Sequence, residues 1–270
     1  MKCVKLKREF ENYRVFILDI DGVIWIEGKP LPNVREALSA LIDSEKKVLL
    51  LTNNSTRSRE EYLLKLKRIC DKISMNNIVT SGYATATFLR DEFGRLKVYV
   101  IGEMGLAREL ALQGHVLLSE DAQQESIDAV VIGLDRQLHY SKLNNATKAI
   151  LNGSLFIATN EDPTIPVEEG VAPGAGSIVA ALSTAVGRRP DYVIGKPNKY
   201  IFEIALKGVR VSMDEVLVIG DRISTDVVGA KVIGAMSALV LAGVTSEHDL
   251  EAADVKPDYV LKSLIDLFEH

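Results

Sequence analysis

Cysteine and positive charge are both scarce in this chain. Cys3 and Cys70 are the only cysteines, and their spacing fits neither a disulfide pair nor a metal site. The formal net charge is −5 at pH 7, so the composition provides no general basic field for a polyanion. We therefore expect two free thiols and no nucleic-acid partner.

Long apolar runs and clustered histidines are also lacking. No signal-peptide pattern begins the sequence, and no stretch is long enough to span a bilayer, so we expect a cytoplasmic protein without a membrane partner. The four histidines are scattered and show no zinc-type or Ser/His/Asp spacing. The segment from Gly174 to Val179 lacks the third glycine or alanine of a dinucleotide motif, and no P-loop occurs.

What is present is the composition of an ordinary folded protein. Hydrophobic residues make up 47% and charged residues 26% of the 270 residues, a length sufficient for two domains. Short β-branched runs alternate with longer segments of helical period, which predicts an α/β fold with a mostly parallel sheet. The principal runs are Val15 to Leu18, Val48 to Leu51, Tyr192 to Ile194, Val216 to Ile219 and Ala238 to Leu241.

The connections between these runs predict an inserted domain. Helices are expected at Asn33 to Glu45, Ser58 to Cys70 and Asn198 to Lys207, but the connection from Thr52 to Lys196 is far longer than one crossover unit. This gap has its own strands, expected at Lys97 to Ile101, Ala129 to Ile132 and Leu155 to Ile157, and helices near Leu106 to Leu112, Ser141 to Leu151 and Ser177 to Val186. We predict a core of residues 1–80 plus 191–270 and an inserted α/β domain of residues 81–190.

Polar groups follow four of the five principal runs. They are Asp19-Ile20-Asp21-Gly22, Thr52-Asn53-Asn54-Ser55, Gly195-Lys196-Pro197 and Gly220-Asp221-Arg222. Because the carboxyl ends of parallel strands share one edge of a sheet, we expect the four groups to converge where open α/β sheets bind ligands. Taken singly, each group also has a structural explanation: a turn for Asp19 and Asp21, a helix cap for the group that begins with Thr52, a solvated side chain for Lys196, and turns or caps for the fourth group.

Together the groups provide the parts needed to hydrolyse a phosphate monoester. A carboxylate nucleophile divides this very slow reaction into two steps, and a second carboxyl two residues later can act as acid and base. The hydroxyl of Thr52 and the backbone N–H groups after it can hold phosphate oxygens, and Lys196 can balance their charge. Asp221, with Asp226 five residues later, suits Mg²⁺.

In their order and their position after strands, the four groups resemble the four motifs of the haloacid dehalogenase superfamily. Three segments of the inserted domain resemble the cap of the NagD-type and 4-nitrophenylphosphatase branch, namely Ile132 to Asp135, Ala158 to Asp162 and Pro173 to Ser177. The resemblance spans nearly the whole chain and implies a Rossmann-like parallel-sheet core with an inserted α/β cap. It also implies a Mg²⁺-dependent phosphatase that acts on a small phosphorylated metabolite through an aspartyl-phosphate.

The resemblance assigns roles to individual residues. Asp19 would be the nucleophile, Asp21 the general acid and base, and Mg²⁺ would be held by Asp19, the backbone carbonyl of Asp21, and Asp221. Asp226 would orient Lys196 or a metal-bound water. The expected substrate contacts are Gly22, Thr52, Asn53, Asn54, Gly174 and Lys196. Ser224 departs from the pattern, because this branch often has a larger polar residue there.

Several alternatives stay open at this point. A phosphotransferase shares the first half of the reaction, and a non-catalytic protein that binds a phosphorylated metabolite would share the fold. A dehalogenase lacks the second carboxylate, which Asp21 supplies here. A homodimer is left open. We expect substrate choice to depend on the stretch from Glu161 to Ser177, whereas Trp25 fits either a substrate-contacting flap or plain packing.

Overall fold

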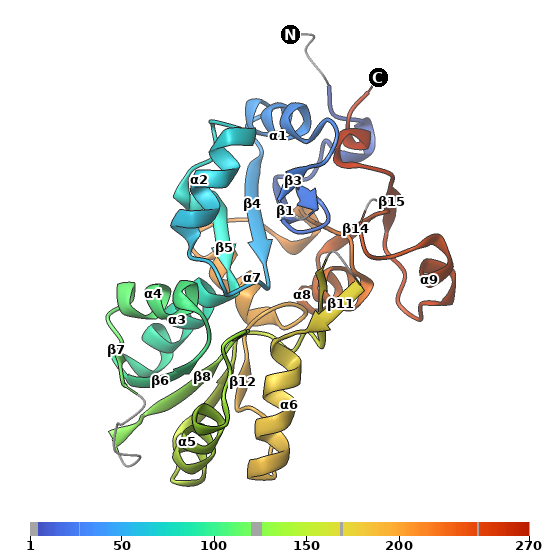
Figure 1. Ribbon diagram of the computed structural model, residues 1–270. Coiled ribbons are helices and arrows are strands. Elements are labelled where there is room, and N and C mark those ends of the chain that lie inside the picture. Colours follow the sequence, from blue (N-terminus) through green and yellow to red (C-terminus); the bar gives the residue numbers. More distant parts are fainter. Residues whose placement is uncertain (1–4, 27, 120–125, 168–169, 242, 270) are drawn as a thin grey trace. The chain divides into compact units, whose positions relative to one another are not determined.

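The computed structural model of the protein describes residues 5–26, 28–119, 126–167, 170–241 and 243–269 (Figure 1). The chain divides into two compact units: the first is Met1–Thr52, Tyr62–Val79 and Ala205–His270, and the second is Asn53–Glu61 and Thr80–Ile204. Cys3, Glu168 and Glu169 lie outside the described residues, while Cys70 is a buried free thiol. The domain boundaries near residues 81 and 190 stay a prediction.

The first unit is organised around a six-stranded sheet in the order β15-β14-β13-β1-β4-β5. β1 (Val15–Asp19) lies between β13 (Val216–Gly220) and β4 (Lys47–Thr52) and pairs with both in parallel. Every residue of β1 and β13 is buried, as expected for parallel strands that are covered on both faces. The other strands are β14 (Met236–Val240), β15 (Tyr259–Leu261) and β5 (Ile78–Thr80), of which β5 was not predicted.

The helices that contribute to this unit bury an apolar stripe. In α1 (Val34–Asp43) the buried residues are Val34, Ala37, Leu38 and Leu41, the helical spacing that points one face at the core. The predicted capping box before α2 (Arg59–Ile69) is formed, since Glu61 Oε2 accepts from the backbone N–H and the hydroxyl of Ser58 at 2.8 and 3.0 Å. The remaining elements are a hairpin of β2 (Trp25–Ile26) and β3 (Lys29–Pro30), a π-helical turn (Ile223–Val227), α8 (Val228–Ile233), α9 (Glu247–Ala252) and short 3₁₀ turns.

The second unit contains a five-stranded sheet in the order β12-β9-β8-β6-β7, whose pairs are all parallel. Its strands are β6 (Lys97–Ile101), β7 (Val116–Leu117), β8 (Ala129–Ile132), β9 (Leu155–Ala158) and β12 (Tyr192–Val193). Its helices are α3 (Ser81–Phe93), α4 (Met104–Leu112), α5 (Tyr140–Leu151), α6 (Ala175–Val186) and α7 (Lys199–Leu206). A separate antiparallel hairpin joins β10 (Thr164–Val167) to β11 (Gly170–Pro173). Across the described residues, no helix has both the length and the apolar character needed to cross a membrane.

The position of β12 corrects one prediction. We expected the run from Tyr192 to Ile194 in the same sheet as β1, but Tyr192 and Val193 pair with Ile157 and Ala158 of β9. The six strands of the sheet that contains β1 do not include β12. Lys196 therefore follows a strand of the second sheet, and the expectation that four groups converge at the edge of one sheet was wrong in this respect.

The segment Asn53–Glu61, which ends in the first turn of α2, belongs to the second unit although it lies outside the inserted stretch. Gly105 N–H donates to Thr56 O at 3.1 Å, and a Cβ on Gly105 would lie 2.4 Å from the backbone of Arg57. Arg59 N–H donates to the buried carboxylate of Glu109 at 2.6 Å, and the Arg59 guanidinium lies over the Tyr83 ring. The second unit is therefore assembled from two separate parts of the chain.

The buried His115 ties the stability of the second unit to pH. Its Nδ1 accepts from Leu96 N–H at 3.3 Å, which leaves Nε2 to donate to Ala86 O at 3.0 Å, and burial lowers the pKa of the imidazole. Below about pH 6.5 the imidazole of His115 binds a proton in the unfolded chain, whereas the lowered pKa keeps it neutral in the folded protein. The free energy of unfolding should therefore fall as the pH is lowered from 7.5 to 5.5.

Thermal unfolding of His115→Asn across this range should show a shallower pH dependence than the wild type. His139→Asn, which removes an exposed histidine, is the matched control and should retain the wild-type slope. Equal slopes for the wild type and His115→Asn would contradict the assignment.

Candidate active site

Asp19 is the last residue of β1 and is held there by backbone pairing. It lies opposite Leu51 of β4, and the following residue, Ile20, donates its N–H to Leu51 O at 3.1 Å. The side chain is only 8% exposed, so the carboxylate leaves a buried strand at a fixed point. This placement at the carboxyl edge of a parallel sheet is where ligands bind in open α/β folds.

Three buried carboxylates meet at this edge. One carboxylate oxygen each from Asp19, Asp221 and Asp226 lie within 4.8 Å of one another, and we call these three residues the acidic cluster. Like charges this close repel strongly when they are removed from water. Carboxylate oxygens are the ligands that Mg²⁺ and Ca²⁺ prefer, so the donor set fits a hard divalent cation.

Three glycines make room for the acidic cluster. A Cβ on Gly22 or Gly243 would lie 2.2 or 2.1 Å from Asp221 Oδ2, and one on Gly220 would lie 2.0 Å from Asp226 Cγ. Gly22 also adopts a φ of +97°, which side chains rarely allow. The backbone of the Asp-Gly turn therefore packs directly against the carboxylate of Asp221.

Backbone and hydroxyl donors orient the two distal carboxylates. Asp221 Oδ2 accepts from Val244 N–H at 2.7 Å, and Asp226 Oδ2 accepts from Arg222 N–H and Thr225 Oγ1, both at 3.2 Å. The π-helical turn from Ile223 to Val227 carries Asp226 back toward β13. Such turns are frequent where a side chain must be aimed at a site.

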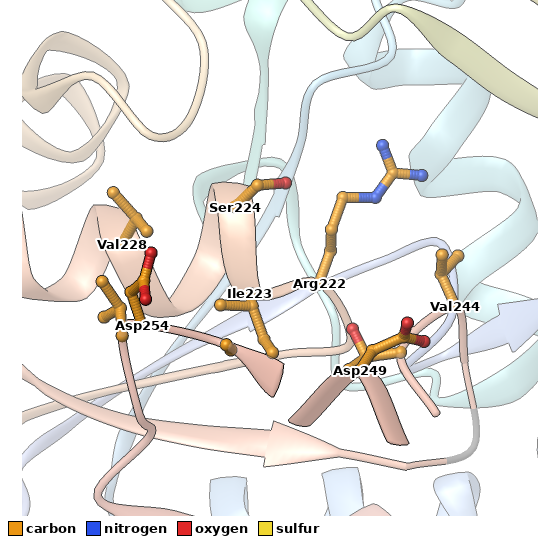
Figure 2. Close-up of a pocket in the computed structure, with 10 residues that line it drawn as sticks. Arg222, Ile223, Ser224, Val228, Val244, Asp249 and Asp254 are labelled. Carbon is orange, nitrogen blue, oxygen red and sulfur yellow. The ribbon is translucent and has the colours of Figure 1, made fainter. Parts of the chain in front are cut away.

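Ser224, the one departure from the expected motif, lies beside a surface pocket of about 550 Å³. Figure 2 shows Ser224, Arg222 and Asp249 around this pocket together with Val244. Asp221 and Asp226, the two carboxylates of the fourth group, both belong to the acidic cluster.

Asp21 has surroundings quite different from those of Asp19. Its side chain is exposed, and each of its oxygens receives one hydrogen bond: Trp25 Nε1 donates to Oδ1 at 2.8 Å, and Thr52 Oγ1 donates to Oδ2 at 3.1 Å. Two carboxylates separated by one residue are thus distinguished by their environments. This arrangement suits one nucleophile and one acid/base group.

In the second unit, Asn53 clamps the backbone of Lys196. Lys196 N–H donates to Asn53 Oδ1 at 2.8 Å, and Asn53 Nδ2 donates to Lys196 O at 2.9 Å and to Asp162 Oδ2 at 3.0 Å. Asn160 Nδ2 donates to the same oxygen of Asp162 at 2.9 Å. The carboxamide of Asn53 is engaged on both sides, so a contact of Asn53 with a phosphoryl oxygen would have to use its backbone N–H.

Other predicted substrate residues also have local partners. Asn54 Oδ1 accepts from the N–H and the hydroxyl of Thr56 at 2.9 and 2.7 Å. Gly174 is the N-cap residue of α6, and a Cβ there would lie 2.3 Å from Asp162 O. Lys196 is buried at 4% exposure. Their contacts with a substrate stay predictions.

Sequence reasoning missed one residue in each unit, Gly243 in the first and Asp162 in the second. Gly243 has no motif neighbours that would mark it, because its role depends on a loop that folds back onto Asp221. Asp162 was predicted as part of a cap segment and of the stretch that governs substrate choice, but not as a partner of Asn53, although a carboxylate soon after a strand was a usable signal. The sequence pattern around Trp25 predicted a flap or plain packing, and the hydrogen bond from its Nε1 to Asp21 was not predicted.

Two family models match this chain, one in its N-terminal part and one in its C-terminal part. Residues 16–115 match the haloacid dehalogenase-like hydrolases, and residues 193–267 match a HAD-hydrolase-like family. An acid sugar phosphatase from Staphylococcus saprophyticus is 35% identical over 94% of this chain and 96% of its own length.

Solved structures agree over nearly the same length. A p-nitrophenyl phosphatase from Archaeoglobus fulgidus has a TM-score of 0.89 and 38% identity, covering 94% of this chain and 98% of that one. A glycerol phosphate phosphatase from Mycobacterium tuberculosis, solved in complex with magnesium, has a TM-score of 0.86 and 33% identity, covering 98% and 79% of the two chains. The predicted fold class, a Rossmann-like parallel-sheet core with an inserted α/β cap, is confirmed.

Proposed function

Because this chain belongs to the haloacid dehalogenase-like hydrolases and is a phosphatase of their NagD and 4-nitrophenylphosphatase branch, we propose that it hydrolyses small phosphate monoesters through an aspartyl-phosphate on Asp19. The observation that carries the proposal is the contrast between two neighbouring carboxylates. Asp19 is buried within the acidic cluster, whereas Asp21 is exposed and held by two donors. A nucleophile and an acid/base group need this difference.

In the first half of the reaction an oxygen of Asp19 forms a bond to phosphorus while the ester P–O bond breaks. Asp21 gives its proton to the departing oxygen, which prevents the release of an unstable alkoxide. In the second half a water oxygen attacks phosphorus and Asp21 accepts a proton from that water. The bond between Asp19 and phosphorus then breaks, so inorganic phosphate leaves and Asp19 is again a carboxylate.

Magnesium is the cofactor that we propose for the acidic cluster. The ion would be held by Asp19, Asp221 and the backbone carbonyl of Asp21. Asp226 lies in the same acidic cluster as Asp19 and Asp221, so it could bind the ion directly or through a water molecule. When bound, Mg²⁺ supplies positive charge against the phosphoryl oxygens and the nucleophile. The Asp221 carboxylate is kept in place for this role by Gly22, Gly243 and Val244 N–H.

We further propose that the Lys196 ammonium offsets the negative charge of the phosphoryl group. Asn53 and Asp162 would hold Lys196 in position for this role. The paired hydrogen bonds between Asn53 and the Lys196 backbone fix the root of the lysine side chain. Asn53 follows Thr52 directly in the chain, and Thr52 bonds to Asp21 within the first unit. This covalent link would couple the clamp of the second unit to the acid/base group.

A direct experiment separates this proposal from a non-catalytic binding protein and from a phosphotransferase. The wild-type protein should release 4-nitrophenolate from 4-nitrophenyl phosphate in the presence of Mg²⁺, and acid quenching should trap phosphate on Asp19. A phosphotransferase would instead show much faster turnover when a sugar hydroxyl is added as acceptor. A binding protein would show neither turnover nor a trapped phosphoenzyme.

Substrate choice is proposed to lie in the β10–β11 hairpin and its flanks, from Glu161 to Ser177. This hairpin belongs to neither large sheet, and Val171 on β11 is 68% exposed, which leaves apolar surface for a leaving group. Replacing residues 168–171 by Gly and Ser should reorder kcat/KM among natural phosphate esters by tenfold or more, about 1.4 kcal/mol.

Hydrolysis of 4-nitrophenyl phosphate should change much less in that variant. Val232→Ser, which alters an exposed valine of α8, serves as the control. An equal loss of kcat/KM for every substrate would mean that the hairpin does not select among substrates. An unchanged order of kcat/KM values would mean that other residues determine substrate choice.

A further inference from the structure

The only tryptophan of the chain has its ring packed in the first unit and its N–H on Asp21. Trp25 begins the β2–β3 hairpin, is 4% exposed and stacks on Tyr62 with a centroid distance of 5.9 Å and an interplanar angle of 9°. Its Nε1 donates to Asp21 Oδ1 at 2.8 Å. Packing explains the position of the ring, but it does not explain why an exposed carboxylate receives the indole N–H.

The backbone around the hairpin leaves this N–H little freedom. Gly22 N–H donates to Trp25 O at 2.8 Å, and the N–H groups of Ile24 and Trp25 donate to Ile20 O at 2.9 and 3.3 Å. Trp25 also pairs with Pro30 across the hairpin. The turn that presents Asp21 and the strand that presents Trp25 are therefore one hydrogen-bonded piece.

The two groups that donate to Asp21, the indole N–H of Trp25 and the hydroxyl of Thr52, differ in whether they can also accept a hydrogen bond. An indole N–H can only donate, so Oδ1 must act as an acceptor whatever the protonation state of the carboxyl group. The hydroxyl of Thr52 can both donate and accept, so Oδ2 tolerates either a lone pair or a proton opposite it. In a carboxylic acid the carbonyl oxygen is a stronger acceptor than the hydroxyl oxygen, so in the acid form of Asp21 the indole N–H favours Oδ1 as the carbonyl oxygen and Oδ2 as the oxygen that carries the proton.

We propose that Trp25 is a positioning residue that directs the transferable proton of Asp21 onto Oδ2. In the first half-reaction the O–H bond at Oδ2 breaks and the proton passes to the leaving oxygen as the ester P–O bond breaks and Asp19 bonds to phosphorus. In the second half a water proton returns to the same oxygen. This inference rests on the proposed function, because it requires Asp21 to be the acid/base group.

The test uses leaving groups that differ in their need for a proton. A series of aryl phosphates from 4-nitrophenyl to phenyl phosphate, together with one alkyl phosphate, is measured as kcat/KM, which reports the first half-reaction and excludes the common hydrolysis of the phosphoenzyme. Trp25→Phe keeps an aromatic ring on Tyr62 but removes the N–H. Benzothienylalanine at position 25, introduced by amber suppression, keeps the shape and replaces only the N–H by sulfur.

Both replacements of Trp25 should reduce kcat/KM for the alkyl phosphate at least ten times more than for 4-nitrophenyl phosphate. Asp21→Asn provides the reference profile with the same or a larger bias. Ile26→Ala, which alters a 44% exposed neighbour on the same hairpin, should show no such bias. An equal loss for all substrates in the two Trp25 variants would overturn the proposal and leave Trp25 a packing residue.

The reference variant also separates failure of this inference from failure of the proposed function. If Asp21→Asn shows no dependence on the leaving group, the acid/base assignment itself is wrong. If Asp21→Asn shows this dependence on the leaving group and the Trp25 variants do not, only the positioning role of Trp25 is wrong. Since Trp25 is the sole indole, resonance Raman can also follow its N–H: the hydrogen-bond-sensitive indole band should shift in Asp21→Ala, and an unchanged band would overturn the contact.

Discussion

Asp19→Asn should abolish turnover, with a loss of several orders of magnitude in kcat. The amide at this position cannot attack phosphorus, and the proposed mechanism requires a covalent intermediate on this side chain. Asp21→Asn should behave differently, because 4-nitrophenolate leaves without an acid and phosphorylation of Asp19 can still proceed. Rapid acid quenching with labelled substrate measures both effects, as bound label for Asp21→Asn and none for Asp19→Asn.

Controls separate lost chemistry from lost structure. Removing one charge from the acidic cluster lowers repulsion among its three buried carboxylates, so Asp19→Asn should unfold at a temperature no lower than that of the wild type in the absence of metal. Asp43→Asn, which alters an exposed carboxylate at the end of α1, is a matched control for the substitution. Wild-type turnover by Asp19→Asn would disprove the proposed mechanism.

The chelator EDTA should eliminate activity, and Mg²⁺ should restore it. Two unit charges 4 Å apart repel by about 4 kcal/mol at an effective dielectric constant of 20, and the acidic cluster contains three such pairs before a phosphate dianion approaches. Ca²⁺ should substitute poorly, because its looser and higher coordination misplaces the nucleophile. Full activity in the presence of chelator would show that the acidic cluster does not work through a metal ion.

Gly243→Ala provides a structural test of the same site. Its added methyl group would lie 2.1 Å from Asp221 Oδ2, so the carboxylate must move. The Mg²⁺ concentration for half-maximal activity should rise at least tenfold, and binding of Mg²⁺ measured by calorimetry should weaken in parallel. Val260→Ala, at an exposed position of β15, should leave both values unchanged. Unchanged Mg²⁺ affinity in Gly243→Ala would remove Asp221 from the metal site.

Regular elements were predictable wherever the apolar pattern was unbroken. The strands at Lys97–Ile101 and Ala129–Ile132 have the predicted bounds, because continuous β-branched runs identify buried parallel strands. β12 shows the limit of such patterns. Two adjacent residues, Tyr192 and Val193, suit either sheet equally well, and only their pairing with β9 decides between them. The short strand β5 was missed for a similar reason, since three residues before a helix give little periodicity.

In the candidate site, too, some features could be predicted from the sequence and others depend on contacts that form only in the folded chain. The carboxylates of the acidic cluster were predictable, because residues that follow buried strands meet at one edge. The bond from Trp25 to Asp21 was not, since it exists only once the β2–β3 hairpin has closed. The clamp of Asn53 on Lys196 joins residues far apart in sequence, and the type of residue alone suggested a phosphate ligand instead.

The two-part construction of the second unit limits how this protein could be recombined with its relatives. A chimera that exchanges only residues 80–204 would keep the old Arg57 and Arg59 beneath a foreign helix in place of α4. Arg57 would then lose the glycine against which its backbone packs, and Arg59 N–H would lose the buried carboxylate of Glu109, because both Gly105 and Glu109 belong to the α4 that was removed. A transplant of substrate preference therefore has to move residues 53–61 in the same exchange, and these include Asn53 and Asn54, two of the proposed substrate-contacting residues.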